Sequence, residues 1–132
     1  MKIMATRSNI AIENQDGSVS AIYCHFDGYI DGVGKILQEN YNTREEMEQL
    51  IALGDISSLG KTIEKTVAYH RDRGEELQEP MQHKTVPLYF EDQNSDIEYS
   101  YCFTLGGQFL VQQSRSKQVA LLEEALEGED VL

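Results

Sequence analysis

The sequence predicts an α+β fold: one domain over residues 1–132, with a mainly antiparallel sheet and helices packed on one face. The first observation is a pair of strand patterns on either side of the hairpin dipeptide Asp16-Gly17. The second is a similar pair around Gly106-Gly107. The third is a set of apolar residues that recur at helical spacing between and after these hairpins. A chain of this length can bury a core without disulfides.

Four elements are expected in the first half of the chain. Residues 2–12 and 19–26 form the strands of the first hairpin, and the second strand is rich enough in β-branched and aromatic residues to be buried on both faces. A helix follows from about residue 32 to residue 41. Another helix begins at the capping box Thr43-Arg44-Glu45-Glu46 and ends at Gly54, with an apolar stripe of Met47, Leu50, Ile51 and Leu53.

The middle of the chain has weaker patterns. Residues 55–60 are expected to form a turn, with a short helical turn as the alternative, and residues 66–70 a strand. Residues 75–82 are polar and indicate a mobile loop. An edge strand is expected at residues 86–90, because Pro87 cannot donate a hydrogen bond within a sheet.

The C-terminal part predicts a hairpin and a helix. Residues 97–113 form the hairpin, whose alternation places Tyr99, Tyr101 and Phe103 on one face. Residues 116–127 form an amphipathic helix capped by Ser114 or Ser116. Residues 128–132 are expected to fray.

The charge of the chain is strongly acidic. There are 23 Asp and Glu residues against 11 Lys and Arg, which gives a formal net charge of −12. Direct binding to nucleic acid is therefore disfavoured, because it depends on cations that replace the counterions of the phosphates. One interpretation of these carboxylates is a protein surface that imitates DNA. The alternative is that they keep the protein soluble, because they are scattered along the sequence rather than gathered in one block.

The sequence contains no signal for a membrane or for a cofactor. No run approaches the roughly 20 apolar residues of a membrane helix, and the N-terminus lacks the apolar core of a secretory signal, so a cytoplasmic location is expected. Cys24 and Cys102 lie in strand-like runs without metal-ligand spacing. They are expected to be buried, reduced thiols.

The first candidate ligand site is the glycine-rich loop after the second strand. It contains His25, Asp27, Tyr29, Gly32, Gly34 and Lys35. The spacing matches neither a P-loop nor a dinucleotide fingerprint. Two glycines at a helix start, followed by a lysine, can still bind one phosphate through backbone N–H groups and a point charge. The alternative is a turn whose glycines serve backbone geometry alone.

The H-x-D pair of His25 and Asp27 is a candidate for chemistry. On a strand both side chains point to the same face and can form an acid–base pair or hold a metal. No second cluster of ligands completes a metal site in the sequence, so the alternative is a histidine held by a local carboxylate. No catalytic residue and no metal is assigned.

The second candidate ligand site is a short basic cluster. Arg71 and Arg73 flank an aspartate and follow Tyr69 and His70. Arginines of this kind bind a phosphate or carboxylate through two parallel hydrogen bonds, while Phe26, Tyr29 and Tyr69 are available to stack on a base. The alternative is a solvated turn with local ion pairs.

Three stretches carry a resemblance to a known family. Residues 5–41 (A-T-R-S-N-I-A-I-E-N-Q-D-G-S-V-S-A-I-Y-C-H-F-D-G-Y-I-D-G-V-G-K-I-L-Q-E-N-Y) resemble small acidic proteins encoded by tailed bacteriophages and prophages. The similarity continues at 50–60 (L-I-A-L-G-D-I-S-S-L-G) and 68–75 (A-Y-H-R-D-R-G-E), so it spans somewhat more than half of the chain. It implies a viral accessory protein in the cytoplasm of the infected bacterial host, where such proteins often block host defence. It assigns no residue a role.

The leading hypothesis is therefore a phage anti-defence sponge, which sequesters a small phosphorylated nucleotide immune signal without cleaving it. Sites of this kind are often completed between subunits, so a homo-oligomer of at least two copies is expected. One alternative is an acidic inhibitor that occupies the nucleic-acid groove of a host restriction or CRISPR nuclease. Another is a hydrolase that uses His25 and Asp27.

Overall fold

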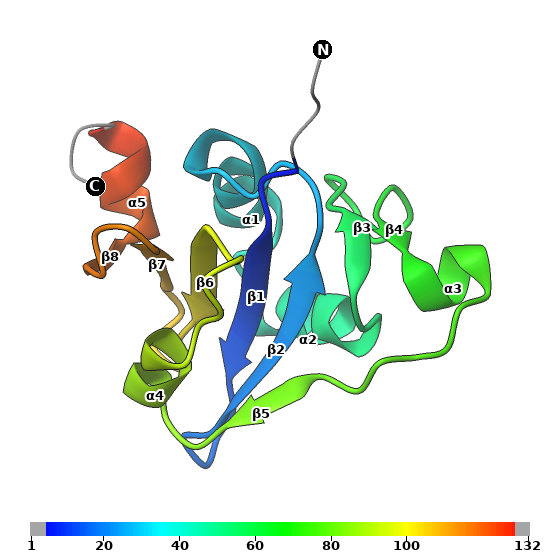
Figure 1. Cartoon of the computed structure of the whole chain (residues 1–132), viewed down its shortest axis with the longest axis horizontal. Helices are drawn as coiled ribbons and strands as arrows, with labels where there is room; N and C mark the ends of the chain where they lie inside the picture. The colour runs from blue at the N-terminus through cyan, green and yellow to red at the C-terminus, as the bar shows by residue number, and fades with distance from the viewer. Residues whose placement is uncertain (1–4, 129–132) are drawn as a thin grey trace.

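The structure is a computed structural model that describes residues 5–128 (Figure 1). Its strands are β1 Ser8–Glu13, β2 Val19–Cys24, β3 Ile56–Ser58, β4 Val67–Ala68, β5 Met81–His83, β6 Tyr99–Phe103, β7 Phe109–Gln113 and β8 Val119–Leu121. Its helices are α1 Lys35–Asn40, α2 Arg44–Ala52, α3 Tyr69–Arg73, α4 Val86–Glu91 and α5 Leu122–Glu127, and a π-helical turn, η1 Ile30–Gly34, leads into α1. The predicted α+β class is confirmed.

All the strands belong to one mixed, mainly antiparallel sheet. The strand order is β4-β3-β2-β1-β6-β7-β8, and β5 pairs with β2 beside this path. The predicted hairpins β1–β2 and β6–β7 are both present, with Ser8 opposite Cys24 and Tyr99 opposite Gln113. Two pairs are parallel, β1 with β6 and β2 with β3, and they join segments far apart in the chain.

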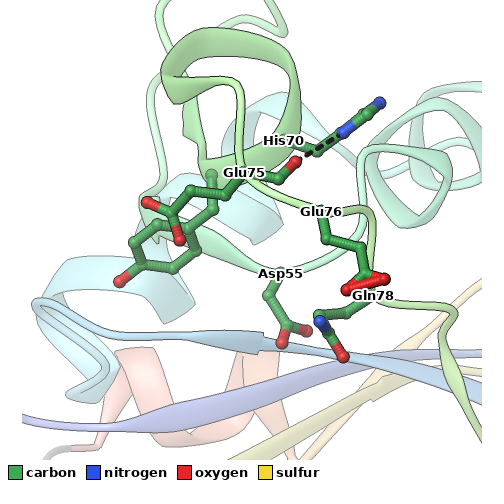
Figure 2. Close-up of a pocket in the computed structure, with 6 residues that line it drawn as sticks. Asp55, His70, Glu75, Glu76 and Gln78 are labelled. Atoms are coloured by element: carbon green, nitrogen blue, oxygen red, sulfur yellow. Dashed lines mark hydrogen bonds between the residues drawn. The ribbon is translucent and has the colours of Figure 1, made fainter.

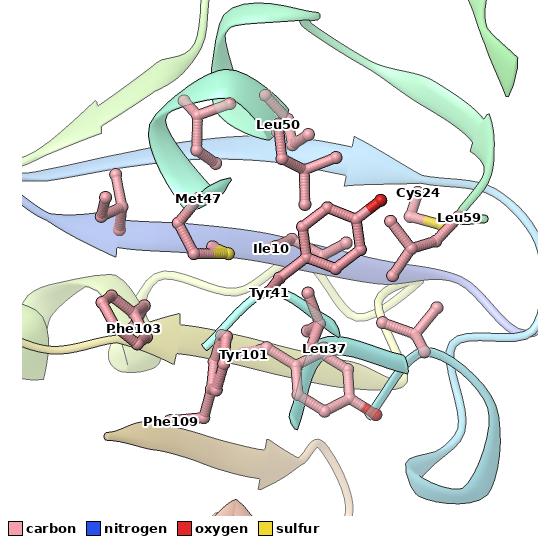
Figure 3. Packing of buried hydrophobic residues seen from close by; sticks show 14 of the residues in the cluster. Ile10, Cys24, Leu37, Tyr41, Met47, Leu50, Leu59, Tyr101, Phe103 and Phe109 are labelled. Carbon is pink, nitrogen blue, oxygen red and sulfur yellow. The ribbon is translucent and has the colours of Figure 1, made fainter. Parts of the chain in front are cut away.

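The main core lies between one face of the sheet and helices α1, α2 and α5. Ile10 and Ile12 of β1 point to this face, as do Ile22 of β2 and the predicted row of Tyr99, Tyr101 and Phe103. Leu37, Met47 and Leu50 cover them from helices α1 and α2, and Tyr41 covers them from the end of α1, as Figure 3 shows. Strand alternation thus directs the largest apolar side chains to one side of the sheet.

The opposite face carries a smaller core, and this corrects the expectation that all helices pack on one side. Ala11, Ala21 and Cys102 alternate with the residues of the main core and pack against Tyr89 and Phe90 of α4. In Figure 1, α2 lies behind the sheet and α4 in front of it. Helix α4 therefore covers part of the second face.

Helix α4 replaces the edge strand expected over residues 86–90. The Thr85 side chain accepts a hydrogen bond from the Leu88 N–H at 3.2 Å, and Pro87 occupies the first turn. A proline is tolerated there because the N–H groups of the first turn have no partner within the helix. The proline therefore marks a helix start rather than an edge strand.

Three further segments differ from expectation. Residues 56–58 form strand β3 rather than a turn, and the strand expected over 66–70 is only two residues long because α3 begins at Tyr69. The C-terminal helix begins at Leu122 and has no side-chain cap, while residues 119–121 pair with β7 as strand β8. Of the residues expected to fray, 129–132 lie outside the described chain.

The rest of the second face is lined by polar side chains. Asn9 of β1 lies opposite Tyr23 of β2, and both project on the same side as Ala11 and Ala21. The segment that leads into β5 and the loop between α4 and β6 border this area. No helix among residues 5–128 is long and apolar enough to cross a membrane.

Candidate functional site

The carboxyl end of β2 lies beside β3 and the start of α3. After β2 the chain continues to pair with β3, since the His25 N–H donates to the Ile56 carbonyl at 3.2 Å and the Phe26 N–H to the Ser57 carbonyl at 3.0 Å. Strand β3 pairs in turn with β4, which runs directly into α3. This pairing brings the H-x-D segment next to the basic helix.

Three aromatic side chains follow one another at this end of β2. The Tyr23 hydroxyl and His25 Nδ1 are 2.7 Å apart and share a hydrogen bond. The His25 ring meets the Phe26 ring edge to face, with 4.5 Å between centroids. Phe26 is 40% exposed, so an aromatic face remains open to a ligand beside the histidine.

Helix α3 places an arginine beside Ser57, the residue of β3 whose carbonyl accepts the Phe26 N–H. The Arg73 guanidinium lies over the Tyr69 ring, 5.2 Å from its centroid, and Nη2 is 3.5 Å from Ser57 Oγ. Within residues 5–128, no carboxylate forms a salt bridge with Arg73. We call this group the aromatic–arginine cluster; its members are Tyr23, His25, Phe26, Ser57, Tyr69 and Arg73.

The pKa of the Tyr23 hydroxyl is raised above its ordinary value. Burial raises this pKa, the positive charge of Arg7 opposes the rise, and Tyr69 and Asp55 add to it. The phenol remains neutral and can donate or accept a hydrogen bond at neutral pH.

Arg71 forms a local ion pair, the alternative that the sequence offered for the basic cluster, and its partner is Asp72. Its guanidinium donates to both carboxylate oxygens of Asp72 at 3.0 and 2.9 Å, and to the Thr66 carbonyl at 2.6 Å. Asp72 also accepts the Ala68 N–H at 2.8 Å. The hydrogen bond from Arg71 lowers the pKa of Asp72 most, and the hydrogen bond from the Ala68 N–H lowers it further. Arg71 is therefore engaged within its own turn, in contrast to Arg73.

His70 and Tyr69 line a small acidic pocket beside α3. The cavity measures about 290 Å³ and is bordered by Asp55, Tyr69, His70, Glu75, Glu76 and Gln78 (Figure 2). His70 Nδ1 is 2.8 Å from the Glu75 carbonyl oxygen, the dashed contact in Figure 2. The carboxylates disfavour an anion in this pocket.

The glycine loop does not offer the N–H groups expected of it. Those of Gly32 and Gly34 donate to the Tyr29 carbonyl at 2.9 and 3.4 Å, and that of Val33 donates to the Asp27 carbonyl at 2.8 Å. Lys35 is exposed at the start of α1. The N–H groups of Gly32 and Gly34 are therefore engaged within the turn, as in the alternative in which the glycines satisfy backbone geometry.

Close packing around the turn explains why residues 32 and 34 are glycines. A Cβ on Gly34 would lie 3.1 Å from Leu122 and 3.2 Å from Tyr101, and one on Gly32 would lie 2.4 Å from the Asp27 carbonyl oxygen. The turn η1 can pack closely only without side chains at these positions. Tyr29 is 42% exposed and borders a separate cavity of about 340 Å³ with Tyr99 and Leu126.

The H-x-D pair does not form an acid–base pair. His25 bonds to Tyr23, and Asp27 adopts a left-handed conformation with φ of 61° in the loop. Among the described residues no group of three or more His, Cys, Asp and Glu side chains could hold a metal ion. The hydrolase hypothesis therefore has no supporting geometry.

Some members of the cluster were not singled out from the sequence. Tyr23 could have been found, because it alternates with His25 on the same face of β2. Ser57 could not, since it requires strand β3, for which a turn was expected. His25, Tyr69 and Arg73 are the predicted site residues that the fold brings together.

Comparison with known proteins gives no relative. No family model, no curated protein and no solved structure matches the chain. The candidate site therefore has to be judged from its own geometry.

Proposed function

We propose that the protein binds a small phosphorylated nucleotide at the aromatic–arginine cluster and sequesters it without cleaving it. The observation that carries the proposal is Arg73, a guanidinium that has no carboxylate partner among residues 5–128 and lies over the half-buried Tyr69 ring. In a chain with a net charge of −12, an arginine of this kind is a local exception to the acidic surface. It suits a planar ligand that carries negative charge.

Each part of a nucleotide has a matching group. The planar guanidinium of Arg73 can bind two phosphate oxygens at once, and its 3.5 Å contact with Ser57 Oγ is weak enough to be exchanged for them. Phe26 and Tyr69 offer aromatic faces for a base, and stacking on such a face contributes about 1–3 kcal/mol per base. The Tyr23 hydroxyl and the His25 ring can bond to the sugar or the base edge.

Sequestration is the form of function that fits this chemistry. Binding without turnover is expected, because a guanidinium and aromatic faces hold a ligand without forming a covalent bond to it. The resemblance to phage and prophage proteins suggests the setting, in which the nucleotide is an immune signal of the bacterial host. The proposal includes a homo-oligomer of at least two copies.

The test is nucleotide binding with a matched pair of arginine variants. Thermal shift and calorimetry with cyclic mononucleotides, cyclic dinucleotides and nucleoside monophosphates should identify a ligand. Arg73→Gln should weaken its binding by roughly tenfold or more, as expected for a charged hydrogen bond. The control is Arg115→Gln, which removes an exposed arginine elsewhere and should leave the affinity unchanged.

Two outcomes would contradict this assignment. If both arginine variants weaken binding equally, general charge rather than the cluster is responsible. If Phe26→Ala and Arg73→Gln both bind the ligand as tightly as the wild type, the nucleotide binds elsewhere.

A further inference from the structure

Strand β8 ends the strand order of the sheet and has no strand on its outer side. It pairs with β7 through Val119, Ala120 and Leu121, and no strand among residues 5–128 lies beyond it. The backbone of such an edge strand offers N–H and C=O groups to another strand. Val119 is also 43% exposed at this edge. A further strand can therefore extend the sheet at β8.

The hydrogen bonds of the neighbouring strand show which backbone groups of β8 point outward. The Ser114 N–H donates to the Glu98 carbonyl on the β6 side at 2.9 Å, in register with the β6–β7 pairs. Successive residues of a strand point these groups to opposite sides, so Val111 points toward β8 and bonds to Ala120. The two residues that flank Ala120 therefore point their N–H groups away from the sheet.

The strand at the other end of the sheet is closed to such pairing. At β4 the Ala68 N–H donates to the Asp72 carboxylate at 2.8 Å, and the Thr66 carbonyl accepts from Arg71 at 2.6 Å. Side chains of α3 thus occupy backbone groups that a further strand would need. Near β8, within residues 5–128, side-chain hydrogen bonds to the backbone reach only the preceding turn, at residues 117–118.

The charges on the two sides of β8 complement a second copy of the same edge. Lys117 is exposed in the turn before β8, and Glu123 is exposed in the first turn of α5. Neither forms a salt bridge within residues 5–128. Ala120 lies midway between them in the sequence. An antiparallel pair of β8 strands with Ala120 opposite Ala120 therefore places Lys117 of each copy opposite Glu123 of the other.

We propose that two copies of the chain pair through antiparallel β8 strands, about a twofold axis at Ala120. In this register Val119 of each copy lies opposite Leu121 of the other, and their outward backbone groups bond across the interface. The exposed Val119 side chain gains an apolar neighbour, and the two sheets continue as one. The symmetric placement of Lys117 and Glu123 matches a second copy rather than an unrelated strand.

This dimer leaves the aromatic–arginine cluster accessible on each copy. Helix α3 follows β4, and β4 and β8 lie at opposite ends of the strand order (Figure 1). Each copy therefore presents its own cluster far from the interface. The inference does not rest on nucleotide binding, so it is tested with protein free of nucleotide, and its failure would leave the role of Arg73 unaffected.

The experiment measures the dissociation constant of the dimer by analytical ultracentrifugation. At about 0.1 M salt, charges more than roughly 10 Å apart are largely screened, so the result reports close pairs. Lys117→Glu and Glu123→Lys should each weaken the dimer roughly tenfold, because two attractive pairs become repulsive. A mixture of these two variants should form a heterodimer about as tight as the wild-type dimer, because both contacts again join opposite charges.

Lys84→Glu is the matched control for the change in net charge. Lys84 is exposed in the segment after β5, and its substitution should leave the dissociation constant unchanged. Val119→Pro tests the backbone bonds: proline removes an outward N–H, which an edge strand tolerates, so the variant should fold and remain monomeric. If it does not fold, the charge variants and their mixture decide the matter.

Two results would overturn the proposal. The first is wild-type protein that stays monomeric up to about 1 mM, a concentration at which even weak association is detected. The second is a dimer that Lys117→Glu weakens no more than Lys84→Glu does, or that the mixed variants fail to restore. Such a dimer would form through a different surface.

Discussion

Two arginines in one short helix have different roles because their neighbours differ. Arg71 is held by Asp72 and by the Thr66 carbonyl, whereas Arg73 lies on Tyr69 and contacts Ser57 only weakly. The sequence marks both as possible anion ligands, since it does not show which carboxylate each guanidinium meets. A bonded arginine stabilises its turn, and one without an acidic partner remains available to a ligand.

Gly32 allows the closest approach in the glycine loop. Gly32→Ala would place a Cβ 2.4 Å from the Asp27 carbonyl oxygen, so the turn η1 would have to shift. We expect the free energy of unfolding to fall by about 2 kcal/mol or more, measured by urea denaturation. Gly106→Ala is the control, since its Cβ would meet nothing closer than 3.7 Å. Equal stability of the two variants would disprove the packing role.

The buried cysteines should make stability depend on alkaline pH. Burial raises the pKa of both Cys24 and Cys102 from 9.0 to about 12. The folded chain therefore keeps its thiol protons where the unfolded chain releases them, so their contribution is complete below pH 9 and is lost as the pH rises toward 12.

The measurement is the free energy of unfolding between about pH 8 and pH 10.5, a range that brackets the ordinary thiol pKa. The wild type should lose stability with rising pH more steeply than Cys24→Ala/Cys102→Ala. Only the slopes are compared, because the substitutions themselves change packing. Parallel slopes would mean that the thiols are not responsible.

At the scale of elements, a capping signal led to a correct helix prediction only where the residues after it also have a helical pattern. Helix α2 was predicted with its cap, and Thr43 Oγ1 accepts the Glu46 N–H at 3.2 Å. The Glu46 carboxylate accepts the Thr43 hydroxyl at 2.8 Å, instead of the backbone N–H expected for a full capping box. The start of α4 carries a similar signal, Thr85 followed by Pro87, which the prediction of an edge strand over residues 86–90 did not take into account.

The cap of α2 gives a prediction at this scale. Thr43→Ala removes the acceptor for the Glu46 N–H and should destabilise the protein by about 1 kcal/mol in urea denaturation. Asn42→Ala changes the preceding exposed residue and should have little effect. Should Thr43→Ala prove as stable as Asn42→Ala, the hydroxyl does not support the helix.

At the scale of the whole molecule, the hairpins were predictable and the order of the strands was not. Asp16-Gly17 and Gly106-Gly107 fix local antiparallel pairs. The parallel pairs β1–β6 and β2–β3 depend on contacts between distant segments, for which a local pattern contains no information. The same holds for the site: His25 and Arg73 were both candidates, but β3, which brings them together, was not expected to be a strand.

The central claim is that the protein retains a nucleotide through the cluster that contains Arg73. The most direct test is mass spectrometry of small molecules released by heating protein purified from cells with an active nucleotide-signalling defence. We expect one intact nucleotide, released in stoichiometric amount from the wild type and absent from folded Arg73→Gln. Wild-type protein that releases no nucleotide, or an Arg73→Gln variant that releases as much as the wild type, would contradict it.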